Sequence, residues 1–189
     1  MDMDAFERIC GFDEGQKTKV LGGKTKAALF DAGLLDCEDC FKPLKDIDLS
    51  GIMIPDAAAM NHSIVGDYVL PSKDSLRARL KGGGHTDKAM EKMDKHGIAY
   101  NVVRTGSNGV IYGNVPDHKE KFKQTGEKQT WFPKSWTEYD IYAAGIFAAN
   151  RGTYVNGYAK EAKYKGINIR IVFTDGRIGT ICPSNDQNS

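Results

Sequence analysis

The sequence contains no long apolar run, because no stretch approaches the roughly 20 apolar residues that a bilayer-spanning helix needs. The N-terminus also lacks the basic and apolar regions of a signal peptide. Nothing in the sequence therefore directs the chain to a membrane. Internal repeats and low-complexity segments are absent too, so we expect no repeat architecture. The remaining composition, 40% apolar and 27% charged over 189 residues, is typical of one sizeable globular domain, alone or with a small appendage.

A large excess of one charge is also lacking, since the formal net charge is +1. The two parts of the chain nevertheless differ in sign. Residues 1–50 hold 7 basic and 11 acidic side chains, whereas residues 51–189 hold 19 basic and 14 acidic ones. The longer part is mildly basic, which suits a polyanionic partner without requiring one.

Cysteine is sparse, with four residues in the chain. Cys37 and Cys40 have the C-x-x-C spacing of a zinc or redox half-site, but no second pair or nearby histidine completes a tetrahedral site. A redox motif would also need a strand before the pair and a helix after it. We therefore expect reduced thiols in a helical segment, no metal site and no cofactor.

The hydrophobic periodicity predicts an α+β fold: N-terminal helices, then a curved, mainly antiparallel sheet with an inserted helix, ending in a β-hairpin. We divide the chain into a helical segment at 1–50, a cap or linker, and a main domain at 51–189. Helices are expected over 4–35 (split at Gly22-Gly23 and ended by Gly33), from 57 into His62, over 86–95 and over 135–150. Strands are expected at 98–103, 110–115 and 129–133, with a terminal hairpin over 167–182 turning at Asp175-Gly176, and a basic loop or helical turn at 71–81.

The chemistry of the chain centres on two histidines, His62 in H-S-I-V-G-D-Y and His85 in G-G-G-H-T. Cleaving RNA without a metal needs a base for the 2′-hydroxyl, an acid for the departing 5′-oxygen and a cation for the phosphorane. Histidine, with an ordinary pKa of about 6.5, can fill either of the first two roles. The glycines before His85 allow close approach to another backbone or to a phosphate, and Asp67 is placed to orient His62.

The other two histidines have simpler interpretations. His96 stands at a helix C-terminus before Gly97, where an imidazole caps carbonyl groups. His118 lies in a lysine-rich loop, where a solvated surface position or a phosphate contact is expected. Pattern alone therefore favours His62 and His85 as a catalytic pair, although a single histidine at either place is more often structural.

These residues carry a resemblance to a known family. H-S-I-V-G-D-Y followed by G-G-G-H-T resembles the H-I-x-x-G-D … G-G-x-H signature of the EndoU-type endoribonucleases, which include bacterial contact-dependent inhibition toxins and the coronaviral uridylate-specific enzyme. Q-T-W-F-P-K-S-W-T-E-Y-D-I is similar to the bacterial branch, and F-T-D-G-R-I-G-T-I-C-P is similar to the family's C-terminal hairpin. The likeness covers residues 57–186 in three ordered blocks. It implies a fold of the Barnase–EndoU–colicin–RelE type and RNA cleavage that leaves a 2′,3′-cyclic phosphate.

The resemblance also implies roles for single residues. His62 and His85 fall on the two catalytic histidines, with His85 as the expected base and His62 as the expected acid. The catalytic lysine is expected at Lys128, with Lys123 and Lys134 as rivals. Thr180 matches a threonine near the scissile phosphate or base, and Lys134 is also expected to contact substrate. Gly84 and Thr86 would flank the phosphate.

The C-terminal hairpin departs from the family pattern at one position. Many members have a tyrosine that stacks on the base two residues after the threonine, and this chain has Cys182 there. A thiol cannot stack, which puts a uridine preference in doubt. A two-residue turn at Asp175-Gly176 would also place Thr180 and Cys182 on the face of Ile169 and Ile171, so that Thr180 would lie at the margin of the sheet or in its core.

The implied partners are RNA, tRNA among them, and a cognate immunity protein of acidic character that covers the cleft; no membrane is implied. Action in a bacterial cytoplasm, after delivery within a larger secreted or phage protein, is the corresponding expectation. Residues 15–33 also resemble the C-terminal end of phage minor head proteins.

Two alternative functions stay open. One is a nucleic-acid-binding or phage structural module, in which aromatics interleaved with lysines over 119–136 bind without catalysis. The other is a metal-dependent hydrolase that uses His62, Asp67 and His85.

Overall fold

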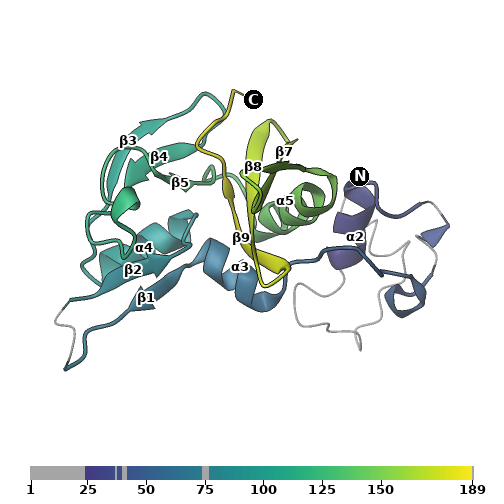
Figure 1. Cartoon of the computed structure of the whole chain (residues 1–189), viewed down its shortest axis with the longest axis horizontal. Helices are drawn as coiled ribbons and strands as arrows, with labels where there is room; N and C mark the ends of the chain where they lie inside the picture. Colours follow the sequence, from purple (N-terminus) through teal and green to yellow (C-terminus); the bar gives the residue numbers. More distant parts are fainter. Residues whose placement is uncertain (1–23, 37, 40–41, 74–76, 189) are drawn as a thin grey trace.

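The computed structural model describes residues 24–36, 38–39, 42–73 and 77–188 (Figure 1). The expected helix before Lys24 and the cysteines at 10, 37 and 40 lie outside these ranges. The elements in chain order are α2 (Lys24–Asp31), η2 (Leu44–Asp46), α3 (Ala57–Ile64), β1 (Asp67–Val69), β2 (Arg79–Gly82), α4 (Asp87–Lys95), β3 (Asn101–Thr105), β4 (Ile111–Asn114), η3 (Lys121–Lys123), β5 (Gln129–Trp131), α5 (Glu138–Arg151), β6 (Thr153–Val155), β7 (Ala159–Tyr164), β8 (Ile167–Thr174) and β9 (Arg177–Pro183).

The predicted α+β class is confirmed, with an inserted helix α5 and a terminal hairpin β8–β9. The strands of the described residues form three antiparallel sheets with the orders β1-β2, β3-β4-β5 and β6-β7-β8-β9. Two details of the prediction are wrong. Part of the expected loop at 71–81 is strand β2, which pairs with β1. Residues 153–164, for which no strand was predicted, form the hairpin β6–β7.

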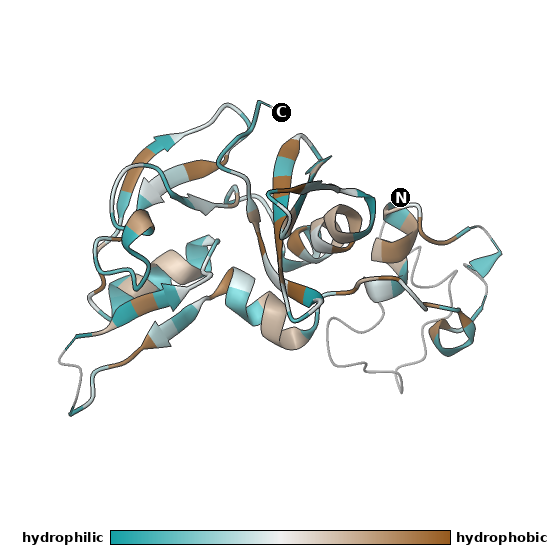
Figure 2. Ribbon diagram, in the orientation of Figure 1, coloured by the Kyte–Doolittle hydropathy of each residue, from teal (hydrophilic) through white to brown (hydrophobic). Residues whose placement is uncertain are grey.

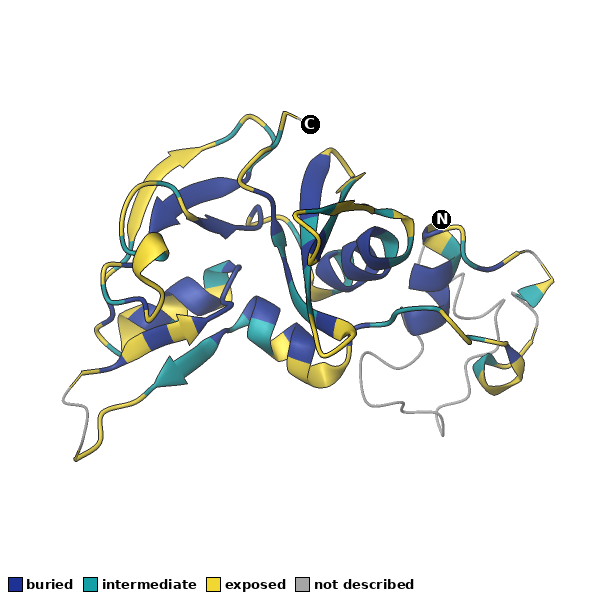
Figure 3. Ribbon diagram, viewed as in Figure 1, coloured by how far each residue is buried: buried dark blue, intermediate teal, exposed yellow. Residues whose placement is uncertain are grey.

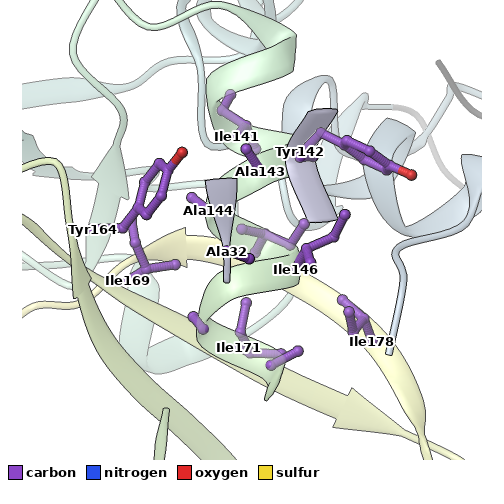
Figure 4. Packing of buried hydrophobic residues seen from close by; sticks show 14 of the residues in the cluster. Ala32, Ile141, Tyr142, Ala143, Ala144, Ile146, Tyr164, Ile169, Ile171 and Ile178 are labelled. Atoms are coloured by element: carbon purple, nitrogen blue, oxygen red, sulfur yellow. The ribbon is translucent and has the colours of Figure 1, made fainter. Parts of the chain in front are cut away.

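The largest core lies where α5 packs against the four-stranded sheet (Figures 2 and 4). The helix begins with a capping box, in which Thr137 and Asp140 each bond the other's backbone N–H group. Ile141 and Ile146 are buried on the helix, and Ile169 and Ile171 are buried on β8. Because Ile169 and Ile171 point toward α5, the residues that alternate with them, such as Arg170 and Val172, point to the other face of the sheet.

Helix α2 packs against α5 and shares its core. Leu29 is fully buried there, and the hydroxyl groups of Thr25 and Tyr142 are hydrogen-bonded at 2.9 Å. The guanidinium group of Arg151 donates to the carbonyl oxygen of Gly33, directly after α2. Residues 24–35 therefore contribute to the main core, and the division of the chain at residue 50 stays a prediction.

A second, smaller core lies between β2, α4 and the sheet β3-β4-β5. Its fully or almost fully buried members include Leu80, Met93, Val115 and Trp131. Every residue of β3 is exposed, whereas β4 and β5 are buried throughout (Figure 3). His62 lies on α3, which contributes to the main core, and His85 follows β2, which contributes to the second core.

Candidate active site

A cleft of about 430 Å³ holds both histidines. Its walls come from the end of α3, the glycine segment after β2, the η3 region, β5 and the strands β8 and β9. Four cationic and two acidic side chains line it, which makes the cleft basic. The lining residues that matter below are His62, Asp67, Lys81, Gly83, His85, Glu120, Phe122, Lys123, Lys128, Thr130, Tyr158, Arg170, Val172, Thr180, Cys182 and Asn185.

His62 lies in the last turn of α3, a helix that Asp56 caps through the N–H of Ala59. Its Nδ1 atom is 2.9 Å from the Asp67 carboxylate. An ionised carboxylate only accepts hydrogen bonds, so Nδ1 carries a proton and Nε2 is left for the substrate. The expected orientation of His62 by Asp67 is present in this geometry.

The glycine segment brings His85 against the end of α3. The N–H of Gly84 donates to the carbonyl of His62 at 2.8 Å, and the N–H of His85 donates to the carbonyl of Ser63 at 2.7 Å. Gly83 has φ +67°, and a Cβ atom at this position would overlap the carbonyl oxygen of His62. The close approach therefore serves another backbone, and these two N–H groups are already bonded within the protein.

His85 is almost completely buried, at 3% exposure, and its Nδ1 atom lies 2.6 Å from the carbonyl oxygen of Thr130 on β5. A carbonyl can only accept, so Nδ1 must carry the proton and Nε2 is the free acceptor of the neutral ring. Burial, followed by the positive charge of Lys123, holds the pKa of His85 well below its ordinary 6.5. His85 is therefore a neutral imidazole at pH 7.

The three candidate lysines lie in different surroundings. Lys123 lines the cleft, is half-buried, and is the cation that acts on His85. Burial lowers the pKa of Lys123, and the groups of Cys182 and Glu120 oppose this shift. Lys128 also lines the cleft but is exposed, whereas Lys134 is exposed and is not among the cleft residues.

A β-bulge decides which way Thr180 and Cys182 face. The turn pairs Thr174 with Arg177 and Phe173 with Ile178, as a two-residue connection requires. One extra residue, Gly179, then shifts the register, so that Val172 pairs with Thr180 and Arg170 with Cys182. All four of these residues line the cleft. The expected placement of Thr180 on the face of Ile169 and Ile171 is wrong, because that extrapolation assumed a regular hairpin.

Gly84 and Thr86 are buried and are not among the residues that line the cleft. The hydroxyl of Thr86 donates to the carbonyl of Ile64 at 2.7 Å. The side-chain amide of Gln129 donates to the carbonyls of Gly83 and Gly84, each at 3.1 Å. The side chains of Thr86 and Gln129 thus hold the glycine segment in place within the protein.

His118 differs from its predicted exposed position, since it is only 1% exposed. Its Nδ1 atom accepts the N–H of Glu120 at 2.8 Å, and Gln124 donates to its carbonyl oxygen at 2.7 Å. The two bonds flank η3, the turn that carries Lys123. Burial first, and then the charge of Lys123, lowers the pKa of His118 to about 4. His96 is the C-terminal capping residue of α4, at the predicted position, and the group that donates to the carbonyls of Lys92 and Met93 is its backbone N–H.

Several cleft residues were not predicted, namely Lys81, Arg170, Tyr158 and Asn185. The alternation along β8 could have indicated Arg170, once the bulge was known. Within the described ranges no three His, Cys, Asp or Glu side chains gather as a metal-binding group. No helix in the described part of the chain is long and apolar enough to cross a membrane.

Fold and site together define a class of protein. A basic cleft in an α+β fold, with one buried neutral imidazole and a second imidazole held by a carboxylate, suits acid–base cleavage of a phosphodiester. A family model described as bacterial EndoU nuclease matches residues 58–185. The chain belongs to this family, as the sequence resemblance predicted, and it is a nuclease. Searches of curated proteins and of solved structures gave no match.

Proposed function

We propose that the chain is a metal-independent endoribonuclease that leaves a 2′,3′-cyclic phosphate. The observation that carries the proposal is the hydrogen bond from His85 Nδ1 to the carbonyl of Thr130. It fixes the tautomer in which Nε2 is a free acceptor, in a cleft that contains a second histidine and a half-buried lysine. This is the base–acid–cation set that transphosphorylation of RNA needs.

His85 is proposed as the general base. Its lowered pKa keeps the ring unprotonated at neutral pH, so Nε2 can accept the proton of the 2′-hydroxyl. The 2′-oxygen then attacks phosphorus. The new P–O2′ bond closes the cyclic phosphate as the P–O5′ bond breaks.

His62 is proposed as the general acid. With Nδ1–H held by Asp67, the imidazolium form carries its second proton on Nε2. That proton goes to the departing 5′-oxygen, which leaves as a hydroxyl group. Asp67 acts here as a positioning residue that sets the direction of the ring.

Lys123 is proposed as the cation that stabilises the phosphorane, in preference to Lys128. Both line the cleft, but Lys123 is the lysine whose charge reaches His85. A half-buried ammonium group is also screened less by water and salt than an exposed one, so its effect on a developing charge is larger. Lys128 and Lys81 are assigned to flanking phosphates. Thr180 faces the same space and can donate its hydroxyl to a phosphate oxygen.

The biological setting is also part of the proposal. A ribonuclease that acts in a bacterial cytoplasm fits a toxin effector with an acidic immunity protein over its basic cleft, and tRNA is one class of possible substrate. The family assignment supports the nuclease class. The toxin role, the RNA target and the inhibitor rest on the resemblance of the sequence motifs.

The chemistry is tested by cleavage of a short RNA in EDTA, with His85→Ala, His62→Ala and the control His96→Ala. We expect each cleft variant to lose about 100-fold or more in kcat/KM, because acid–base catalysis contributes about 100- to 10,000-fold per group. His96→Ala, which changes a histidine outside the cleft, should keep its activity. Retained activity in either cleft variant, with an unchanged thermal melt, would refute the assignment.

A substrate with 2′-deoxyribose at the cleaved position tests the nucleophile. It should resist cleavage completely, because the attacking oxygen is missing. Mass spectrometry of the products should show 2′,3′-cyclic phosphate ends. A binding protein without catalysis, the second candidate, would leave the RNA intact in both substrates.

A further inference from the structure

Two aromatic side chains enter the cleft from different parts of the fold. Phe122 belongs to η3, in the connection between β4 and β5, and directly precedes Lys123. Tyr158 belongs to the turn between β6 and β7 in the other sheet. Both line the cleft, yet Phe122 is 60% exposed and Tyr158 is 59% exposed. Two large rings are therefore presented to solvent inside the same basic depression.

Neither ring is engaged by the protein. Among the residues that the structure describes, Phe122 and Tyr158 take part in no ring–ring or cation–ring contact. The equally exposed Tyr154, outside the cleft, contacts the ring of Phe173 at 6.2 Å and lies under the ammonium group of Lys160 at 5.0 Å. A single exposed aromatic residue is ordinary. Two unengaged rings that line one cationic cleft are typical of a surface that awaits a ligand with flat faces.

Each ring is connected with a different part of the proposed site. Phe122 is the neighbour of Lys123, whose charge reaches His85. Tyr158 precedes Ala159, which pairs with Val172, and Val172 pairs with Thr180. Phe122 thus lies on the side of the base and the cation, and Tyr158 lies at the level of Thr180. Cys182, next to Thr180 on the same face of β9, offers no surface for stacking.

We propose that Phe122 and Tyr158 are the base-stacking residues of the cleft, one for the nucleobase on each side of the bound phosphate. This inference rests on the proposed function for its substrate. Stacking uses the face of a base, so every base is accepted and the bases must be unpaired. Specificity would then follow from the accessibility of the RNA strand more than from the identity of one base.

The test measures binding with a ligand that cannot be cleaved. A 2′-O-methyl octanucleotide of mixed sequence and an abasic backbone of the same length are titrated against Phe122→Leu, Tyr158→Leu and the control Tyr154→Leu, and binding is followed by fluorescence anisotropy. Each cleft variant should raise Kd for the octanucleotide about 5- to 100-fold, the range that loss of one stacked base implies. Neither should change Kd for the abasic strand.

The outcomes separate this inference from the proposed function. Equal Kd values for the wild type and both leucine variants on the octanucleotide would overturn it, as would equal losses on the abasic strand or no measurable binding by the wild type. Phe122→Tyr and Tyr158→Phe should restore the affinity that the leucine variants lose. Absence of cleavage of unmodified RNA by the wild type would instead refute the proposed function, and it would leave the measured binding difference unaffected.

Discussion

At the scale of the residue, the site depends on how the surroundings of each imidazole fix its proton. The Nδ1–H group of His85 donates a hydrogen bond to the carbonyl of Thr130, and the ring is buried, so its neutral form is favoured. His62 is partly exposed beside the Asp67 carboxylate. The two imidazoles are thus the same type of residue but differ in burial and in hydrogen-bond partner, a carbonyl for His85 and a carboxylate for His62.

The pH dependence of cleavage follows from the lowered pKa of His85. A base is lost when it is protonated, so activity should persist at pH 6.5 and fall only as the pH drops through the lowered pKa. Lys123→Gln removes a positive charge that lowers this pKa, so the pKa of His85 should rise. NMR titration of the imidazole resonances of His85 measures the shift directly, without relying on residual activity.

Lys128→Gln is the matched control for this titration, since Lys128 lines the same cleft but does not act on His85. It should leave the pKa of His85 unchanged. An upward shift in Lys128→Gln with none in Lys123→Gln would transfer the role of the cation to Lys128. His118 supplies an internal reference, because its pKa should also rise in Lys123→Gln.

At the scale of the element, the site depends on a contact between a helix end and a glycine segment. The carbonyls of His62 and Ser63, at the end of α3, accept the N–H groups of Gly84 and His85. This contact is possible because Gly83 has φ +67° and no Cβ atom. The distance between the two histidines is therefore set by backbone hydrogen bonds, and the side chains follow.

Gly83→Ala should separate the two histidines. Its Cβ atom would overlap the carbonyl of His62, so the hydrogen bonds to α3 must break or lengthen. We expect a loss of about 100-fold or more in kcat/KM, since acid and base no longer act on one phosphate. RNA cleavage measures the loss of kcat/KM, and urea unfolding of the same preparation measures the change in the free energy of unfolding.

Gly97→Ala is the control for backbone strain. Gly97 has φ +64° but has open space where a Cβ atom would be. It should cost about 1–2 kcal/mol of unfolding free energy, as a left-handed residue with a side chain does, and it should leave kcat/KM unchanged. Similar losses of activity in both variants would show that strain alone, and not the overlap with His62, disturbs the site.

The sequence predicted the helices and strands better than it predicted the register of the strands and the faces on which their side chains lie. The Asp175-Gly176 turn, the strands β4 and β5 and helix α5 were all evident from periodicity and turn residues. The face of Thr180 was predicted wrongly, because one bulge at Gly179 reverses the alternation of every residue after it. An isolated glycine within a strand was the available signal. Likewise, Asn156-Gly157 is a turn signal for the hairpin β6–β7, and both residues have positive φ there.

Burial was the other property that the sequence did not supply. Lys123, Lys128 and Lys134 are equivalent in a list of residues, and only packing makes Lys123 the half-buried one. His118 stands among lysines and so was expected on the surface, yet it is buried against the turn that it holds. Such differences depend on contacts between distant segments, which local patterns do not encode.

At the scale of the whole molecule, two cores meet at the cleft. One lies between α5 and the sheet β6-β7-β8-β9, and the other lies beneath β2, α4 and the sheet β3-β4-β5. Groups from both sides approach each other where Thr130 of β5 donates its hydroxyl to the carbonyl of Pro183 on β9, at 2.8 Å. The cleft therefore keeps its shape only while both cores are folded, which links the stability of remote helices to activity.

Leu29→Ala tests how far this dependence extends into the N-terminal segment. Leu29 of α2 is fully buried against the main core, so its truncation should lower the free energy of unfolding by about 2–5 kcal/mol. Leu70→Ala, at a position that is 51% exposed, is the matched control and should change the free energy of unfolding by less than about 0.5 kcal/mol.

Urea unfolding is followed in a Trp136→Phe background, which leaves Trp131 of the second core as the only indole reporter. If residues 24–35 fold together with the nuclease, the Trp131 transition moves to lower urea as a single step, and kcat below the transition stays unchanged. A Trp131 transition that does not move would show instead that the second core unfolds independently of the core to which Leu29 belongs.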